Sequence, residues 1–122
     1  MLTYATVGSN DLEKAKAFYD QLLAVAGLEK RFDHPSGGRI YGAGAAIFGV
    51  LGPHNGEPAT VGNGSMTGFM LKSRDEVDAF HAKALELGGT CDGGPGPRGG
   101  GNAYFAYVRD LDGNKLCVYN MA

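Results

Sequence analysis

The sequence predicts an α+β fold with two βαβββ modules related by pseudo-two-fold symmetry, which form a cleft between curved mixed sheets. Each half of the chain reads as a strand, a capped amphipathic helix that ends at glycine, and three short strands. The two halves also match at a shift of 62 residues, which places Phe18 on Phe80 and Gly27 on Gly89. We therefore assign residues 1–122 to a single domain, with module one at about residues 1–57 and module two at about residues 62–122.

The first half opens with a predicted strand at residues 3–8. Asn10 is the expected helix N-cap, because Glu13 follows three residues later as in a capping box. Apolar residues then recur at helical spacing: Leu12, Ala15, Phe18 and Leu22. Gly27 is the expected C-terminal stop. Three strands complete the module, at residues 28–33, 39–42 and 45–51.

The second half repeats this order, beginning with a strand at residues 65–72. Ser73 and Glu76 form a second capping box, and the helix is expected to end at Gly88. Its apolar stripe consists of Val77, Phe80, Ala84 and Leu87. Strands are predicted at residues 90–92, 104–109 and 115–120, with a glycine-rich loop at residues 93–102.

One helix covers only one face of each small sheet, so the other faces of the two sheets can enclose a cleft, which is the natural ligand site. The net charge is −2 and the basic residues form no cluster, which argues against a nucleic-acid partner. No apolar run is long enough for a membrane span or a signal peptide. We expect a cytoplasmic protein with Cys91 and Cys117 as reduced thiols.

Three segments carry a resemblance to a known family. They are NDLEKAKAFYDQLL after the first strand, GNGSMTGFMLKSRDEVDAFHAKALELGGT in the middle, and AYFAYVRDLDGNKLCVY near the end. The chain resembles the vicinal oxygen chelate superfamily, which includes glyoxalase I, bleomycin resistance proteins and extradiol dioxygenases. The resemblance implies the paired-module fold and a homodimer, and it leaves the activity open.

The resemblance also implies where a divalent metal would bind in metal-dependent members: on the first and last strands of each module. At those positions this sequence has Tyr4 in place of histidine, Met66 after Gly-Ser in place of histidine, and Cys117 in place of glutamate. The strand at residues 45–51 has no ligating side chain. His34 and His54 lie in predicted turns, and His81 is expected to be solvated, so we expect no metal cofactor.

We therefore expect a protein that binds a small organic molecule in the cleft without the usual metal, as a sequestering resistance protein or a regulator. The expected lining consists of Tyr4, Phe48, Met66, Tyr104 and Cys117. Arg98, the one charge in the glycine-rich loop, is a candidate contact for an anionic ligand. Cys117 has two interpretations, a small buried hydrophobic residue or a reactive thiol.

Two enzymatic alternatives remain open. One is a metal-dependent enzyme of the lactoylglutathione lyase or dioxygenase type with a non-standard ligand set that draws on Glu57 or a second chain. The other is a metal-free lyase or isomerase with Tyr104 or Cys117 as the acid–base group.

Overall fold

A computed structural model describes all residues, 1–122. The elements follow in the order β1 (Tyr4–Gly8), α1 (Leu12–Val25), β2 (Glu29–Asp33), β3 (Arg39–Ala43), β4 (Ala46–Leu51), β5 (Thr67–Met70), α2 (Arg74–Glu86), β6 (Thr90–Pro97), β7 (Tyr104–Arg109) and β8 (Lys115–Asn120). This order confirms the prediction of two βαβββ modules. Neither helix is long and apolar enough to cross a bilayer.

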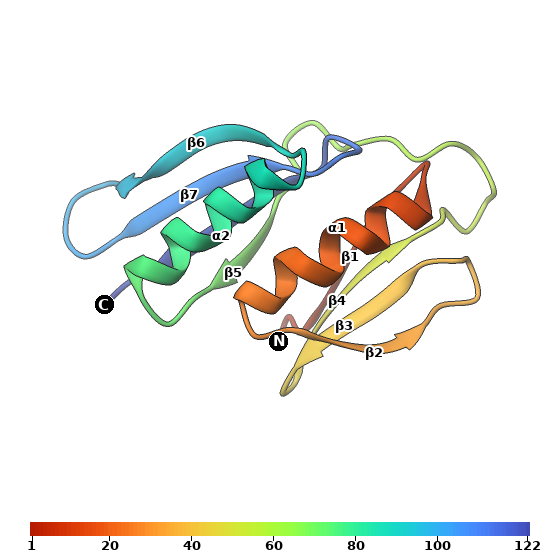
Figure 1. Ribbon diagram of the computed structural model, residues 1–122, viewed down its shortest axis with the longest axis horizontal. Coiled ribbons are helices and arrows are strands. Elements are labelled where there is room, and N and C mark those ends of the chain that lie inside the picture. The colour runs from red at the N-terminus through yellow and green to blue at the C-terminus, as the bar shows by residue number, and fades with distance from the viewer.

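The two modules have the same sheet topology. The strand order is β1-β4-β3-β2 in the first sheet and β5-β8-β7-β6 in the second. In each sheet the first strand pairs in parallel with the last, and the other pairs are antiparallel. Both helices lie on the same side of the sheets and contact each other (Figure 1). The opposite side of both sheets therefore has no helix over it.

The helix caps agree with the sequence in one module and differ in the other. Ser73 caps α2 by accepting a hydrogen bond from the Glu76 N–H (3.1 Å), as predicted. In α1 the cap is Asp11, whose carboxylate accepts from the Lys14 N–H (3.1 Å), so the assignment to Asn10 is wrong by one residue. Asn10 instead exchanges two hydrogen bonds with the backbone of Ala59 (2.7 and 2.9 Å) and holds the loop after β4 against β1.

The glycine-rich segment after α2 is also more ordered than the sequence suggested. β6 runs from Thr90 to Pro97, whereas the predicted strand ended at residue 92. Its pairing with β7 is interrupted by register shifts between Cys91 and Gly93 and between Gly93 and Gly96. Such bulges accommodate glycine and proline in an edge strand, which explains how this composition continues as a strand.

A single hydrophobic core of 17 buried residues joins the two modules beneath the helices. An aromatic series crosses the boundary: Phe48 of β4 lies 5.2 Å from Tyr19 and 5.3 Å from Phe69 of β5, measured between ring centroids. Phe69 in turn lies 6.2 Å from Phe80 of α2. Because these rings are shared, neither module encloses its core without the other.

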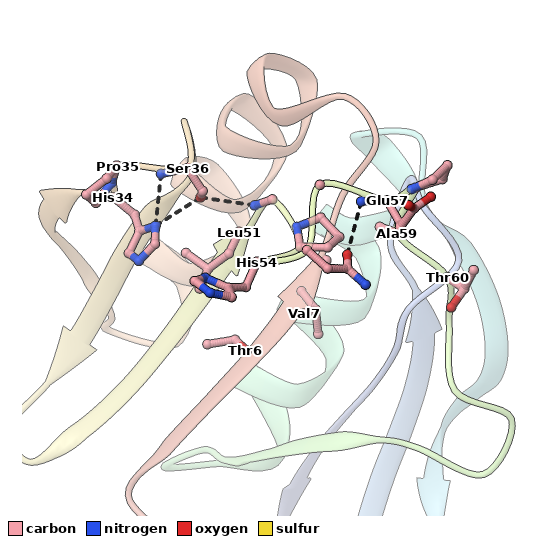
Figure 2. A pocket seen from close by; sticks show the side chains of 16 residues that line it. Thr6, Val7, His34, Pro35, Ser36, Leu51, His54, Glu57, Ala59 and Thr60 are labelled. Carbon is pink, nitrogen blue, oxygen red and sulfur yellow. Dashed lines mark hydrogen bonds between the residues drawn. The ribbon is translucent and has the colours of Figure 1, made fainter.

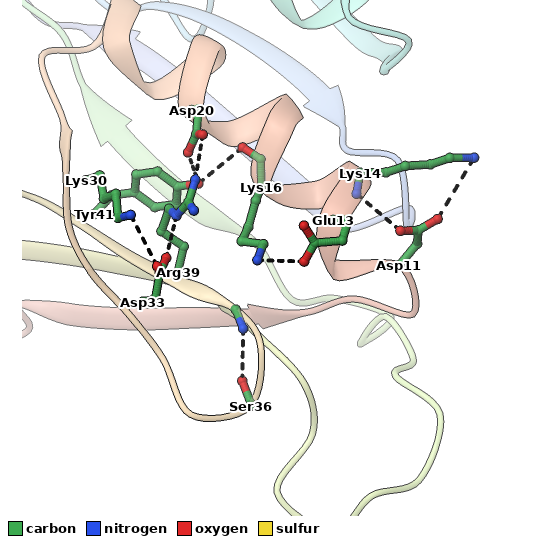
Figure 3. A network of polar contacts seen from close by, with 11 residues as sticks. Asp11, Glu13, Lys14, Lys16, Asp20, Lys30, Asp33, Ser36, Arg39 and Tyr41 are labelled. Atoms are coloured by element: carbon green, nitrogen blue, oxygen red, sulfur yellow. Dashed lines mark hydrogen bonds and ion pairs between the residues drawn. The ribbon is translucent and has the colours of Figure 1, made fainter.

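A polar network fixes the helix of module one to its outer strands (Figure 3). The Arg39 guanidinium donates to Asp20 of α1 (2.6 Å) and to Asp33 of β2 (2.8 Å). The Tyr41 hydroxyl also donates to Asp20 (2.7 Å). These contacts hold α1 over β2 and β3 and leave the other face of the sheet uncovered.

The D-x-D-G-N turn between β7 and β8 joins the modules at their other end. Asp110 is 5% exposed and accepts a hydrogen bond from the Tyr19 hydroxyl of α1 (2.5 Å). It also accepts from the backbone N–H groups of Asp112 (2.9 Å) and Asn114 (2.8 Å). The Asn114 amide donates to Asp110 and to the Gly8 carbonyl of β1, both at 2.9 Å. The pKa of Tyr19 is raised well above its usual value, mainly because the hydroxyl is buried and also because of the negative charge of Asp110.

We expect Asp110→Ala to lower the free energy of unfolding by roughly 3 kcal/mol or more, since several buried donors lose their acceptor together. Urea denaturation followed by circular dichroism measures this. Asp33→Ala is the matched control, because Asp33 is an exposed carboxylate in a surface ion pair and its loss should change stability little. Equal losses in the two variants would contradict a special role for Asp110.

Candidate functional site

The face of the two sheets opposite the helices is uncovered, and we call it the open face. Successive side chains of a strand point to opposite faces of the sheet. Strand residues whose sequence neighbours pack into the core therefore lie on the open face. In module one the open face includes Tyr4, Thr6, Ile40 and Gly49, and in module two it includes Gly68, Met70, Phe105, Tyr107, Cys117 and Tyr119.

A groove of about 420 Å³ lies between β1 and β5, where the two sheets adjoin. We call it the inter-module groove. Thirteen of its 16 lining residues are hydrophobic. The lining consists of Leu2–Ala5, Ala26, Leu28, Ala43, Ala46–Phe48 and Met66–Leu71. None of these side chains carries a charge, so the groove suits a neutral, mostly apolar ligand.

Two of the predicted site residues meet in this groove. Tyr4 and Met66 both line it and are 52% and 50% exposed. The prediction placed them on the first strand of each module; Tyr4 begins β1 and Met66 directly precedes β5, and both strands contribute to the groove lining.

Cys117 lies one strand away from the groove lining. It pairs with Gly68 of β5 and Tyr107 of β7 and is 3% exposed. A Cβ added at Gly68 would lie 3.0 Å from the Cys117 Sγ, so the thiol sits directly beside that glycine. Burial raises the pKa of Cys117, and the nearby Lys115 only partly offsets it. This environment favours the interpretation of Cys117 as a buried packing residue with a neutral thiol.

Phe48 and Tyr104 do not lie on the open face. The Phe48 ring is 2% exposed and belongs to the shared core, so it reaches the groove only as part of its floor. The Tyr104 hydroxyl donates to Asp78 of α2 (2.6 Å), which raises the Tyr104 pKa. The spacing argument for Tyr104 was wrong because Ala106 and Val108 themselves face the helix, and alternation places Tyr104 with them.

Arg98 lies outside the groove, at the end of the β6–β7 hairpin. Its guanidinium donates to the carbonyls of Gly94 (2.5 Å) and Pro97 (3.2 Å) and lies 5.8 Å from the centroid of the Tyr107 ring. It forms no ion pair with a carboxylate. Its positive charge is therefore directed to the aromatic part of module two.

The open face of module two carries an aromatic strip that was not predicted from the sequence. The Phe105 ring is stacked on Tyr119 (centroids 5.0 Å apart, planes at 12°) and on Tyr107 (6.1 Å, 18°). The Lys115 ammonium lies 5.2 Å from the Tyr107 ring centroid. The alternation of side chains along YFAYVR and KLCVYN could have indicated this strip. It does so only once the core-facing residues are known, which are Ala106, Val108, Leu116 and Val118.

A second hollow, of about 1010 Å³, lies at the end of module one and is lined by polar side chains together with glycine, proline and a few apolar residues (Figure 2). His34 and His54 lie in loops there, as predicted, together with Glu57. The His34 Nδ1 accepts from the Ser36 N–H (3.1 Å) and contacts the Ser36 hydroxyl (2.9 Å), so the neutral ring carries its proton on Nε2. These contacts organise the loop in front of the hollow.

The donor set does not fit a divalent metal site. The phenol of Tyr4, the thioether of Met66 and the raised-pKa thiol of Cys117 are poor ligands for the ions that prefer carboxylate or imidazole. Nowhere in the chain do three His, Cys, Asp or Glu side chains come together in a way that could hold a metal ion.

The two cysteines lie on opposite faces of the second sheet and cannot pair with each other. Cys91 pairs with the core-facing Val108 and is exposed beside α2, whereas Cys117 is on the open face. The Cys91 thiol contacts the imidazole Nε2 of His81 at 3.2 Å. His81 is only 9% exposed, so the expectation that it is solvated is wrong. It lies on the flank of α2 that β6 covers, which the apolar stripe alone did not indicate.

The two βαβββ modules, with one shared core, have the architecture of a known superfamily. A family model matches residues 2–118, and the chain belongs to the Glyoxalase/Bleomycin resistance protein/Dioxygenase superfamily. No protein in a search of curated proteins matches the chain.

Solved structures agree with this assignment. A glyoxalase/bleomycin resistance protein from Albidiferax ferrireducens T118 is 44% identical, with 100% of this chain and 99% of that chain covered and a TM-score of 0.90. A lactoylglutathione lyase from Agrobacterium tumefaciens is 22% identical (98% and 92% covered, TM-score 0.71). The fosfomycin resistance protein FosX from Listeria monocytogenes is 18% identical (100% and 93% covered, TM-score 0.72). The last two comparisons support the fold alone.

We expect the triple variant Tyr4→His, Met66→His and Cys117→Glu to gain zinc and nickel binding, because it places imidazoles at two positions that line the groove and a carboxylate at the position paired with the groove residue Gly68. Isothermal titration compares it with the natural chain. The double variant without Cys117→Glu is the control and should bind more weakly. A folded triple variant that binds no better than the natural chain would show that these positions do not converge.

Proposed function

We propose that this protein binds a small, neutral, mostly apolar organic molecule in the inter-module groove, without the divalent metal of metal-dependent members of its superfamily. The observation that carries the proposal is the lining of the groove, which is hydrophobic at 13 of 16 positions and has no charged side chain. A binding role of this kind corresponds to a sequestering resistance protein or a regulator.

The size and chemistry of the groove support this ligand class. A volume of about 420 Å³ falls within the range of small-molecule pockets. Apolar contact supplies the binding free energy, at roughly 25 cal/mol per Å² of buried apolar surface. The polar side-chain groups of the lining are the hydroxyls of Thr3, Tyr4 and Thr67, which suit a ligand with few hydrogen-bonding atoms.

The metal-free part of the proposal rests on the donor chemistry. Tyr4 and Met66 present an aromatic and a thioether side chain to the groove, and both are better suited to apolar contact than to metal ligation. Met66 in addition can adapt its shape to different ligands, because its side chain is unbranched and flexible.

We expect the natural chain, purified without a histidine tag, to contain far less than one metal ion per molecule by inductively coupled plasma mass spectrometry. Near-stoichiometric Ni, Zn, Fe or Mn would instead favour a metal-dependent enzyme with a non-standard ligand set.

We expect the neutral fluorescent dye Nile red to bind one molecule per groove and Met66→Glu to weaken its binding about tenfold, or 1.4 kcal/mol, because the new carboxylate would be desolvated by the dye. Phe32→Glu is the matched control: Phe32 is 55% exposed but does not line the groove. Equal weakening in both variants would contradict binding in the groove. Fluorescence titration measures both.

We further propose that the protein acts in the cytoplasm as a homodimer. Large apolar side chains remain exposed on or beside the open face, including Phe32 (55%) and Met70 (71%), and a second copy is a natural cover for them. Light scattering at micromolar concentration should give twice the mass of the chain. The monomer mass would contradict the dimer.

A further inference from the structure

A thiol and an imidazole meet outside the groove, between α2 and the edge strand β6, which lie side by side (Figure 1). The Cys91 Sγ lies 3.2 Å from the Nε2 of His81. The same sulfur accepts a hydrogen bond from the Gly93 backbone N–H at 3.4 Å. Cys91 is exposed, whereas His81 is 9% exposed and its ring nitrogen is directed at the thiol.

We propose that Cys91 and His81 form a nucleophile–base pair, and that Cys91 is a site of mixed-disulfide formation with low-molecular-weight disulfides. A nucleophile within hydrogen-bond distance of a base is the arrangement that activates a thiol. His81 lies in α2 and Cys91 lies in β6, ten positions further along the chain. The two side chains therefore meet only because β6 packs against α2.

The surroundings of His81 leave its ring unprotonated, as a base must be before it acts. Burial lowers its pKa, with a smaller opposing effect from Asp78, and in the tautomer with the proton on Nδ1 the Nε2 atom that faces the thiol can accept a proton. The Gly93 N–H in turn stabilises the negative charge that develops on the sulfur. Cys117 lacks both contacts and is buried at 3% exposure.

Cys91 is exposed on β6, the edge strand of the second sheet, which has no strand on its outer side. A disulfide needs such space, because the attacking sulfur, the attacked sulfur and the leaving sulfur align during exchange.

The exchange is balanced without another reagent. The Cys91 thiol transfers its proton to His81 Nε2 while Sγ attacks one sulfur of R–S–S–R, and the S–S bond of the reagent breaks. A new Cys91–S–S–R bond forms, and the leaving thiolate takes the proton from the imidazolium to become R–SH. Cys91 is oxidised, and half of the small disulfide is reduced.

The test uses 2-hydroxyethyl disulfide, a neutral reagent, at pH 7 with the natural chain. Peptide mapping by mass spectrometry follows modification of Cys91 and Cys117 separately. A synthetic peptide of residues 88–94 supplies the same sequence around Cys91 without His81. We expect folded Cys91 to react roughly tenfold faster than the peptide, and Cys117 more slowly than the peptide.

His81→Gln should reduce the Cys91 rate to about that of the peptide, while the control His34→Gln, a loop histidine far from the pair in sequence, should leave it unchanged. Circular dichroism reports whether each variant is folded. Folded Cys91 that reacts no faster than the peptide overturns the proposal, and so does a folded His81→Gln variant with an unchanged rate. If His81→Gln does not fold, the comparison of the natural chain with the peptide decides.

Discussion

The buried carboxylate of Asp110 is the constraint on which the arrangement of the two modules depends. It receives hydrogen bonds from its own turn, from Tyr19 of α1 and from the Asn114 amide, which also bonds the Gly8 carbonyl of β1. A carboxylate at this depth is stable only when its acceptor sites are filled. The turn therefore closes the β7–β8 hairpin and attaches it to module one in the same set of bonds.

The Asp110 turn fixes one end of the boundary between the modules, and the inter-module groove lies at the other end. With the modules joined through Asp110 and through the aromatic rings of the shared core, β1 and β5 run beside each other without pairing in one sheet. Their unpaired edges leave the inter-module groove between them. The helices contact each other on one side, so the open face remains accessible on the other, while the groove reaches from the β1 and β5 edges to Ala26 at the end of α1.

The local patterns of the sequence were sufficient for the fold and for part of the site. Helical spacing and the repeated order of elements depend on near neighbours, and they located both helices and the duplicated topology. Tyr4 and Met66 followed from their strand positions and do share the groove. Tyr104 was misplaced because alternation gives two faces but does not say which one the helix covers. The Cys91–His81 contact was missed because it depends on how β6 packs against α2, which no local pattern encodes.

The two modules share a topology but differ in the chemistry of their open faces. The central strands of module one have glycine at positions 42 and 49, and the Ile40 side chain lies over Gly49, where a Cβ would come within 2.7 Å of it. The central strands of module two instead carry Phe105, Tyr107 and Tyr119 as a stacked strip. Large polarisable side chains therefore gather on one half of the open face, beside Met70 of β5, which pairs with Tyr119. Duplication supplied the symmetric scaffold, and divergence of the open-face residues made the two halves of the open face chemically distinct.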